Sequence, residues 1–138
     1  MMKLGLVLLL SSLALGMDAF PEATFTGSGV KQFPDGKSKS YQISMRSHAS
    51  QLDFRYEFPG IDPIDFSLQF TFEKNGFFKV GEIGSGYCGK NSCHWQVKLG
   101  VDDTEEWTLF FNENRLEKLG SRLHGGEKNY WEELLTRQ

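Results

Sequence analysis

The chain has 138 residues and a formal net charge of −3, with 15 Lys and Arg residues against 18 Asp and Glu residues. A weakly acidic surface of mixed sign excludes a nucleic-acid-binding role driven by a basic face. About 120 residues follow an apolar N-terminal stretch, which is enough for one domain and too few for two.

Residues 1–19 have the layout of a secretory signal peptide. Lys3 precedes a run of apolar residues without charge, and small residues allow cleavage after Gly16 or Ala19. The run is shorter than the about 20 residues that span a bilayer, and an uncleaved anchor is the alternative. We therefore expect an exported protein, secreted or periplasmic, with a single β-barrel domain over residues 20–138 and no membrane span in it.

Strands are predicted along the rest of the chain, because apolar and polar residues alternate between regularly spaced turn clusters. The first segment, residues 24–33, contains Gly27 and Gly29, which are typical of barrel bends. The alternating segments that follow are 41–46, 51–58, 65–73, 77–83, 95–101 and 107–111. Residues 81–87 also fit a loop. Residues 128–137 fit either a short amphipathic helix or a closing strand, and we favour the strand.

These segments place about twenty large apolar side chains on one face, enough for a single core without helices. An open sheet would leave two edges exposed to pairing, and closure removes them. The predicted fold is therefore all-β, a single antiparallel up-and-down meander of about 8–10 strands closed into a barrel. Phe77 and Phe110 each adjoin another Phe and are expected to point outward, where they would form a patch if they fall together.

The only two cysteines are Cys88 and Cys93, and an exported chain favours their oxidation. The residues between them carry Gly and Asn, so the disulfide is expected to staple a hairpin at its tip. His94 adjoins the pair, but a fourth metal ligand is missing, so we predict no metal site.

No catalytic set stands out in the sequence. A nucleophile needs a base and an orienting group, and no spacing of Ser, His and Asp singles out such a set. Most neighbouring carboxylates fall in or beside turns, where we expect them to be solvated. They are Asp62 and Asp65, Asp102 and Asp103, Glu105 and Glu106, and Glu132 and Glu133. We therefore predict that the protein is not an enzyme.

The exported meander, with a Gly-x-Gly first strand and the ending Trp-Glu-Glu-Leu-Leu-Thr-Arg, resembles the calycin superfamily, which includes lipocalins and fatty-acid-binding proteins. The resemblance implies a barrel with an internal ligand. Gly27-Ser28-Gly29 lacks the tryptophan of the lipocalin Gly-x-Trp signature. Arg55 and Tyr56 are adjacent and do not form the Arg-x-Tyr clamp of fatty-acid-binding proteins. The resemblance therefore carries over the shape and no ligand residues.

Two functions remain open, and they differ in whether the barrel interior is hollow or filled. In the first, the interior binds a small hydrophobic or amphipathic ligand. The candidate lining residues are Tyr41, Phe54, Tyr56, Phe70, Trp95 and Trp107. No cofactor is predicted, although haem would be tested at His48, which is expected at the barrel mouth. In the second, a filled barrel engages a protein partner, such as an extracytoplasmic enzyme, through Lys90, Asn91 and His94 of the 88–93 hairpin.

Overall fold

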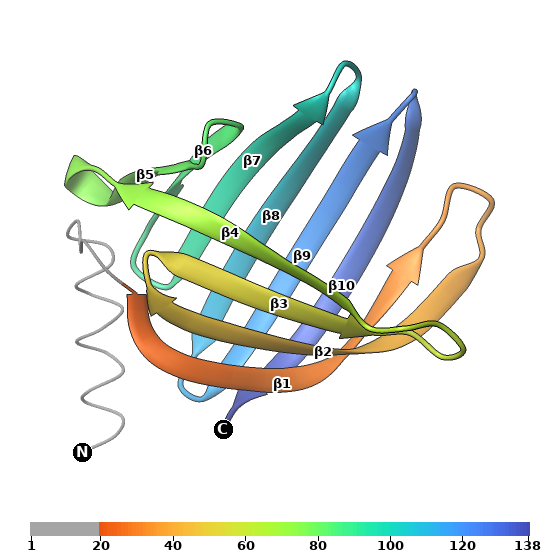
Figure 1. Ribbon diagram of the computed structural model, residues 1–138, viewed down its shortest axis with the longest axis horizontal. Coiled ribbons are helices and arrows are strands. Elements are labelled where there is room, and N and C mark those ends of the chain that lie inside the picture. The colour runs from red at the N-terminus through yellow and green to blue at the C-terminus, as the bar shows by residue number, and fades with distance from the viewer. Residues whose placement is uncertain (1–19) are drawn as a thin grey trace.

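Alternating burial along the chain builds ten antiparallel strands, which close into one up-and-down barrel (Figure 1). The computed structural model describes residues 20–138, and the predicted signal peptide lies outside the described residues. The strands are β1 (Phe20–Gln32), β2 (Ser38–Ala49), β3 (Gln51–Glu57), β4 (Ile64–Phe72), β5 (Phe77–Val80), β6 (Gly84–Cys88), β7 (Ser92–Gly100), β8 (Asp103–Asn112), β9 (Arg115–His124) and β10 (Glu127–Arg137), with a 3-10 turn η1 (Lys74–Gly76) between β4 and β5. The predicted all-β meander is confirmed.

Pairing of the first and last strands closes the barrel. β1 pairs with β2 on one side and with β10 on the other, in a register that runs from Phe25 opposite Arg137 to Gln32 opposite Tyr130. The strand assignment of residues 128–137 is thereby confirmed. Residues 81–83 form a turn and the following residues form β6, so both descriptions of the 81–87 segment hold in part.

The two ends of the barrel differ in what fills them. The mouth end carries the turns at 33–37, 58–63, 81–83, 101–102 and 125–126. The filled end carries the turns at 50, 73–76, 89–91 and 113–114. Near the filled end, Trp95 packs edge-on against Phe70, with ring centroids 5.6 Å apart, and also against Phe78. These side chains are almost fully buried, so this half of the interior is solid.

Glycines on the inner face leave room for large side chains on the neighbouring strands. Gly120 lies opposite both Trp107 and Trp131, and a Cβ atom at position 120 would overlap the Trp131 indole. Gly86 lies in the same way between Phe78 and Trp95. Small residues between large ones let the interior be packed without voids.

Two predicted inward residues are instead exposed. Leu99 is 45% exposed and Val101 is 89% exposed. The register of β7 against β8 shifts between Lys98 and Gly100, which ends the regular alternation before the turn. The prediction that these two side chains point into the barrel was therefore wrong.

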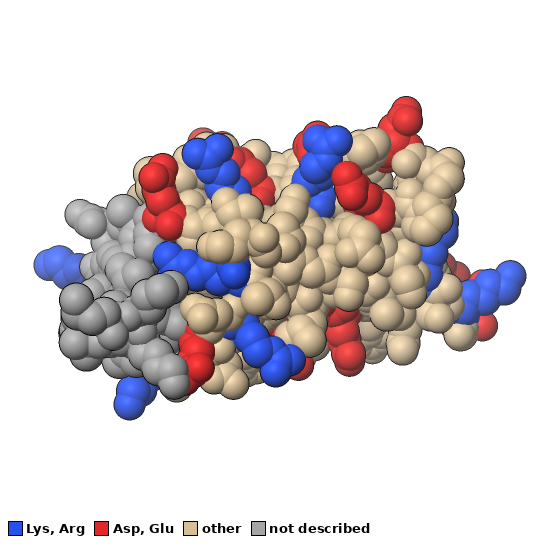
Figure 2. Space-filling view, turned by 90° about the horizontal axis from the view of Figure 1, so that it is seen from below, with Lys and Arg blue, Asp and Glu red and all other residues tan. Residues whose placement is uncertain are grey.

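The predicted staple is confirmed, because Cys88 and Cys93 face each other across the β6–β7 hairpin and form a disulfide. Phe77 and Phe110 are exposed as expected, but they lie in β5 and β8, with β6 and β7 between them, and do not meet. None of the described residues forms a helix long and apolar enough to cross a membrane. Figure 2 shows one face of the molecule, on which basic and acidic side chains are interspersed.

Candidate functional site

A pocket of about 240 Å³ opens at the mouth end of the barrel, and we call it the mouth pocket. Five of its lining residues are aromatic or aliphatic side chains on β2 to β4 and their connection, two are tryptophans and three are charged side chains of β1, β8 and β9. Those that line it are Lys31, Tyr41, Tyr56, Phe58, Ile64, Phe66, Glu105, Trp107, Arg122 and Trp131. The barrel is therefore neither wholly hollow nor wholly filled.

The apolar lining from β2 to β4 and their connection consists of Tyr41, Tyr56, Phe58, Ile64 and Phe66. The rings of Tyr56 and Phe66 are stacked, with centroids 5.6 Å apart and an interplanar angle of 4°. Alternation places these side chains on the same face as the buried Phe54, so they form flat inner walls of the pocket.

The charged groups at the mouth pocket are only partly paired. Arg122 donates from two of its nitrogens to the two carboxylate oxygens of Asp103, each at 2.8 Å. Glu105 accepts a hydrogen bond of 2.9 Å from the Trp107 indole. Burial raises the pKa of Glu105, and the Trp107 hydrogen bond and the Arg122 charge oppose that shift.

A buried polar cluster lies beneath the mouth pocket, and it consists of Lys118, Glu133, Tyr41 and Tyr56. The Lys118 ammonium donates to Glu133 and, at 2.9 Å, to the Tyr56 hydroxyl. The Tyr41 hydroxyl donates to the other Glu133 oxygen at 2.5 Å. The Lys118 nitrogen also lies 3.7 Å from the centroid of the Trp107 ring, within reach of a cation–π interaction.

Gly29 makes this polar cluster possible. It lies opposite Tyr41 on β2 and opposite Glu133 on β10. A Cβ atom at position 29 would come within 2.6 Å of the Tyr41 ring and 2.8 Å of the Glu133 side chain. The missing side chain on β1 therefore lets residues from its two neighbouring strands meet across it.

The ionisation of the polar cluster reflects its burial. Burial lowers the pKa of Lys118 to about 8, and the charge and hydrogen bond of Glu133 oppose the shift. Burial also raises the pKa of Tyr41 and of Tyr56, and the negative charge of Glu133 adds to both shifts. Both phenols are therefore protonated at neutral pH and can donate hydrogen bonds.

The six predicted lining residues separate into two groups. Tyr41, Tyr56 and Trp107 line the mouth pocket, and Phe54 lies next to it, with its ring centroid 5.7 Å from that of Trp107. Phe70 and Trp95 contact each other towards the filled end and do not border the mouth pocket. Alternation identifies the inner face of a strand, but it does not say which part of that face stays uncovered.

Several residues of the site were missed because solvated carboxylates were expected in turns. Glu133 is 2% exposed and Asp103 is 8% exposed, and Glu105 lines the mouth pocket. The prediction that these three carboxylates are solvated was therefore wrong. One signal was available, because Glu133 lies between Trp131 and Leu135 in the alternation of the last strand.

The histidine proposed as a haem ligand lies away from the mouth. His48 hydrogen-bonds to Asp53 at 2.6 Å, next to the turn at residue 50 of the filled end. Both side chains alternate with buried residues, which places them on the outer face. Among the described residues, no group of three or more His, Cys, Asp or Glu side chains could hold a metal ion.

The candidate partner residues of the 88–93 hairpin are not equivalent. Lys90 and Asn91 are exposed at the tip. His94 is half-buried on β7 and hydrogen-bonds to Thr108 on β8 at 2.9 Å. The hairpin tip therefore presents two of the three predicted residues to solvent, while the third is engaged by the sheet.

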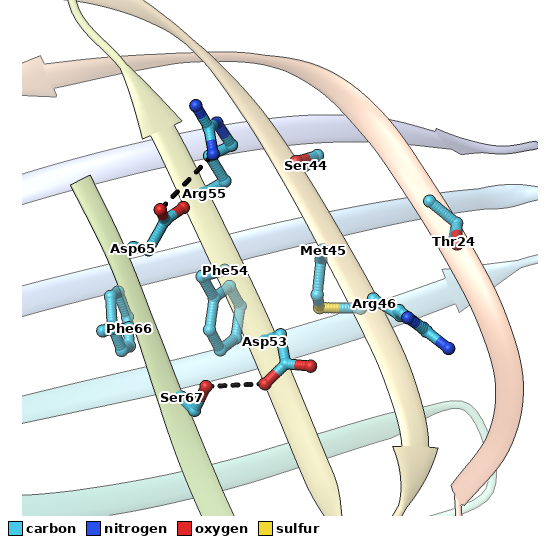
Figure 3. A pocket seen from close by; sticks show the side chains of 10 residues that line it. All are labelled: Thr24, Ser44, Met45, Arg46, Asp53, Phe54, Arg55, Asp65, Phe66 and Ser67. Carbon is cyan, nitrogen blue, oxygen red and sulfur yellow. Dashed lines mark hydrogen bonds and ion pairs between the residues drawn. The ribbon is translucent and has the colours of Figure 1, made fainter. Parts of the chain in front are cut away.

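A second hollow, of about 380 Å³, lies over β1 to β4 and includes outward polar side chains (Figure 3). Arg55 pairs with Asp65 at 3.4 Å, and Ser67 donates to Asp53 at 2.6 Å. These neighbouring contacts satisfy much of its charge within the sheet. The mouth pocket combines enclosure by aromatic rings with incompletely paired polar groups, so it is the better candidate site.

The sequence matches no protein-family model and no curated protein. Its structure is similar to the crystal structure of Rv2717c from M. tuberculosis, with a TM-score of 0.58. The two proteins share 11% sequence identity over 96% of this chain and 97% of that chain. At this identity the likeness shows the fold alone, which in this chain is a ten-stranded antiparallel barrel.

Proposed function

We propose that the protein is an exported, non-enzymatic, calycin-like barrel that binds a small amphipathic ligand in the mouth pocket. The observation that carries the proposal is the composition of this pocket, in which aromatic walls enclose a few polar groups at one end of a filled barrel. Such a combination is typical of small-molecule sites, where apolar contact supplies affinity and polar groups fix orientation.

The size of the mouth pocket limits its ligand. Its volume of about 240 Å³ lies just below the range of roughly 300–1,000 Å³ that is common for drug-sized ligands. None of the described residues that line the pocket is a histidine, so haem ligation would have no histidine donor here. We therefore favour a ligand of one or two rings, or a short chain, over haem or a long acyl chain.

Isothermal titration calorimetry with a panel of small ring compounds and short-chain amphiphiles tests this proposal. The variant Phe58→Ala removes a wall of the mouth pocket, and Phe72→Ala is its control, because Phe72 is also a half-buried Phe but lies at the filled end. We expect at least one compound to bind, and Phe58→Ala to weaken it about tenfold while Phe72→Ala leaves it unchanged. The proposal fails if no panel member binds or if both variants weaken binding equally.

A second candidate function is recognition of a protein partner near the 88–93 hairpin. Phe77 is 54% exposed and Tyr87 is 53% exposed, and their ring centroids lie 6.3 Å apart on the outer face. Exposed aromatic pairs of this kind are enriched in protein interfaces. If this function holds, Lys90→Ala together with Tyr87→Ser will abolish capture of a specific partner without unfolding the barrel, and unchanged capture excludes it.

A further inference from the structure

Lys31 carries an ammonium group at the mouth pocket that forms no salt bridge with the described residues, although the charge of Glu105 acts on it. Its side chain is half-buried and lines the pocket. Its nitrogen lies 5.4 Å from the ring centroid of Phe33 and 5.9 Å from that of Trp131. Arg122, the other cation of the pocket, is held by both oxygens of Asp103. Lys31 is therefore the cation that remains available to an anion.

Trp131 adds an aromatic ring to the same wall. It lies directly opposite Lys31 in the pairing of β1 with β10, and it lines the mouth pocket. Its indole nitrogen is buried and has no hydrogen-bond acceptor in the part of the chain that the structure describes. This nitrogen packs against Gly120 of β9 and has almost no accessible surface, so a bound ligand would contact the Trp131 ring and not this donor.

The remaining walls favour a flat ligand. The Tyr56 and Phe66 rings are nearly parallel, and the Trp107 and Trp131 rings meet at 64° with centroids 5.3 Å apart. Planar rings pack on such surfaces in offset or edge-on arrangements and lose little conformational entropy on binding. A flexible chain would lose more, because each immobilised bond has an entropic cost.

We infer that the mouth pocket takes a small planar aromatic carboxylate of one or two rings, with its carboxylate at Lys31 and its ring against the Tyr56 and Phe66 walls. This inference rests on the proposed function and specifies its ligand class. Glu105 lies in the same pocket, and its negative charge opposes an anion placed beside it. The Glu105 charge also acts on Lys31, so a bound carboxylate competes with Glu105 for the ammonium.

Calorimetric titration with three probes tests the inference: 2-naphthoate, the neutral 2-naphthalenemethanol and the flexible octanoate. Lys31→Gln removes the ammonium. Lys128→Gln is the matched control, because Lys128 is an exposed lysine near the same end of the barrel and lies 5.4 Å from the Tyr130 ring. We expect 2-naphthoate to bind about tenfold more tightly than the alcohol, and Lys31→Gln to remove that difference while Lys128→Gln preserves it.

The outcomes separate this inference from the proposed function. If the alcohol binds as tightly as 2-naphthoate, or Lys31→Gln leaves their difference intact, the carboxylate assignment is overturned and the mouth pocket remains a ligand site. If octanoate binds as tightly as 2-naphthoate, the planar aromatic class is overturned. If none of these probes and no member of the wider panel binds, the proposed function itself fails.

Discussion

Lys118 shows how a single residue can depend on its surroundings inside this barrel. Its side chain and that of Glu133 have no exposed surface, so each charge relies on the other and on the tyrosine hydroxyls. Removing one member of a buried ion pair leaves the other charge without compensation, whereas replacing both removes the cost. The pair therefore makes these two positions strongly interdependent.

The variant Lys118→Met is expected to lower the free energy of unfolding by about 3 kcal/mol, because it leaves Glu133 buried without its cation. The double variant Lys118→Met/Glu133→Gln removes both charges and is expected to recover most of that loss. Urea unfolding monitored by tryptophan fluorescence measures both. Equal destabilisation by the single and double variants would show that the charges are not coupled.

Asp53 provides a pH-dependent prediction on the outer face. Hydrogen bonds from Ser67 and Gln51, each at 2.6 Å, lower the pKa of this carboxyl from 3.8 to about 2. Because the folded-state pKa lies below the unfolded value, the contribution to stability is present above about pH 4 and is lost as the pH falls through about 2.

A carbon-13 NMR titration of the Asp53 carboxyl group is expected to give a midpoint near 2. Ser67→Ala removes a donor and should move the midpoint upward, while Ser85→Ala, an exposed serine on β6, should not. A midpoint near 3.8 in the unmodified protein would contradict the assigned role of these hydrogen bonds.

At the scale of elements, the packing around β1 depends on a glycine that leaves space for side chains of its two neighbouring strands. Gly29 lets Tyr41 and Glu133 approach each other from β2 and β10. Gly29→Ala should therefore lower the free energy of unfolding by about 2 kcal/mol through overpacking. Gly100→Ala is the control, because a Cβ atom there would meet its nearest neighbour at 3.9 Å. Urea unfolding that shows equal stability for the two variants would contradict this packing role.

The sequence predicted most strands because their inner faces are apolar, as for β3 with Leu52 and Phe54. β9 was less visible, because its inner face carries Lys118, Gly120 and Arg122 in place of apolar residues. Lys118 of the buried ion pair, together with Gly120 and Arg122, thus removed the alternation that predicts a strand. The mouth pocket was predicted in part: Tyr41, Tyr56 and Trp107 were expected to line the interior, but Lys31, Glu105 and Arg122 were not, because only apolar residues were assigned to the inner face.

At the scale of the whole molecule, the covalent staple and the candidate site lie at opposite ends. The Cys88–Cys93 disulfide closes the hairpin at the filled end, while the mouth pocket lies between the turns of the other end. The disulfide encloses a short loop and is expected to stabilise the fold by about 2 kcal/mol. Its effect should therefore be local.

Replacing both cysteines by serine tests this separation. Hydrogen–deuterium exchange is expected to speed up at the tip of the β6–β7 hairpin, because the unfolded segment is less constrained, and to remain unchanged around Trp131. Faster exchange at both ends would mean that the barrel opens as a single unit and that the staple also supports the mouth.

The even number of strands determines at which end of the barrel a fusion partner or a surface can be attached. In an up-and-down barrel of ten strands, β1 begins and β10 ends at the same rim, here the filled end. A fusion partner or surface linker joined through either of these strand ends would therefore extend away from the mouth pocket. Whether the barrel is attached to a surface through the start of β1 or through the end of β10, the mouth pocket would face the solution.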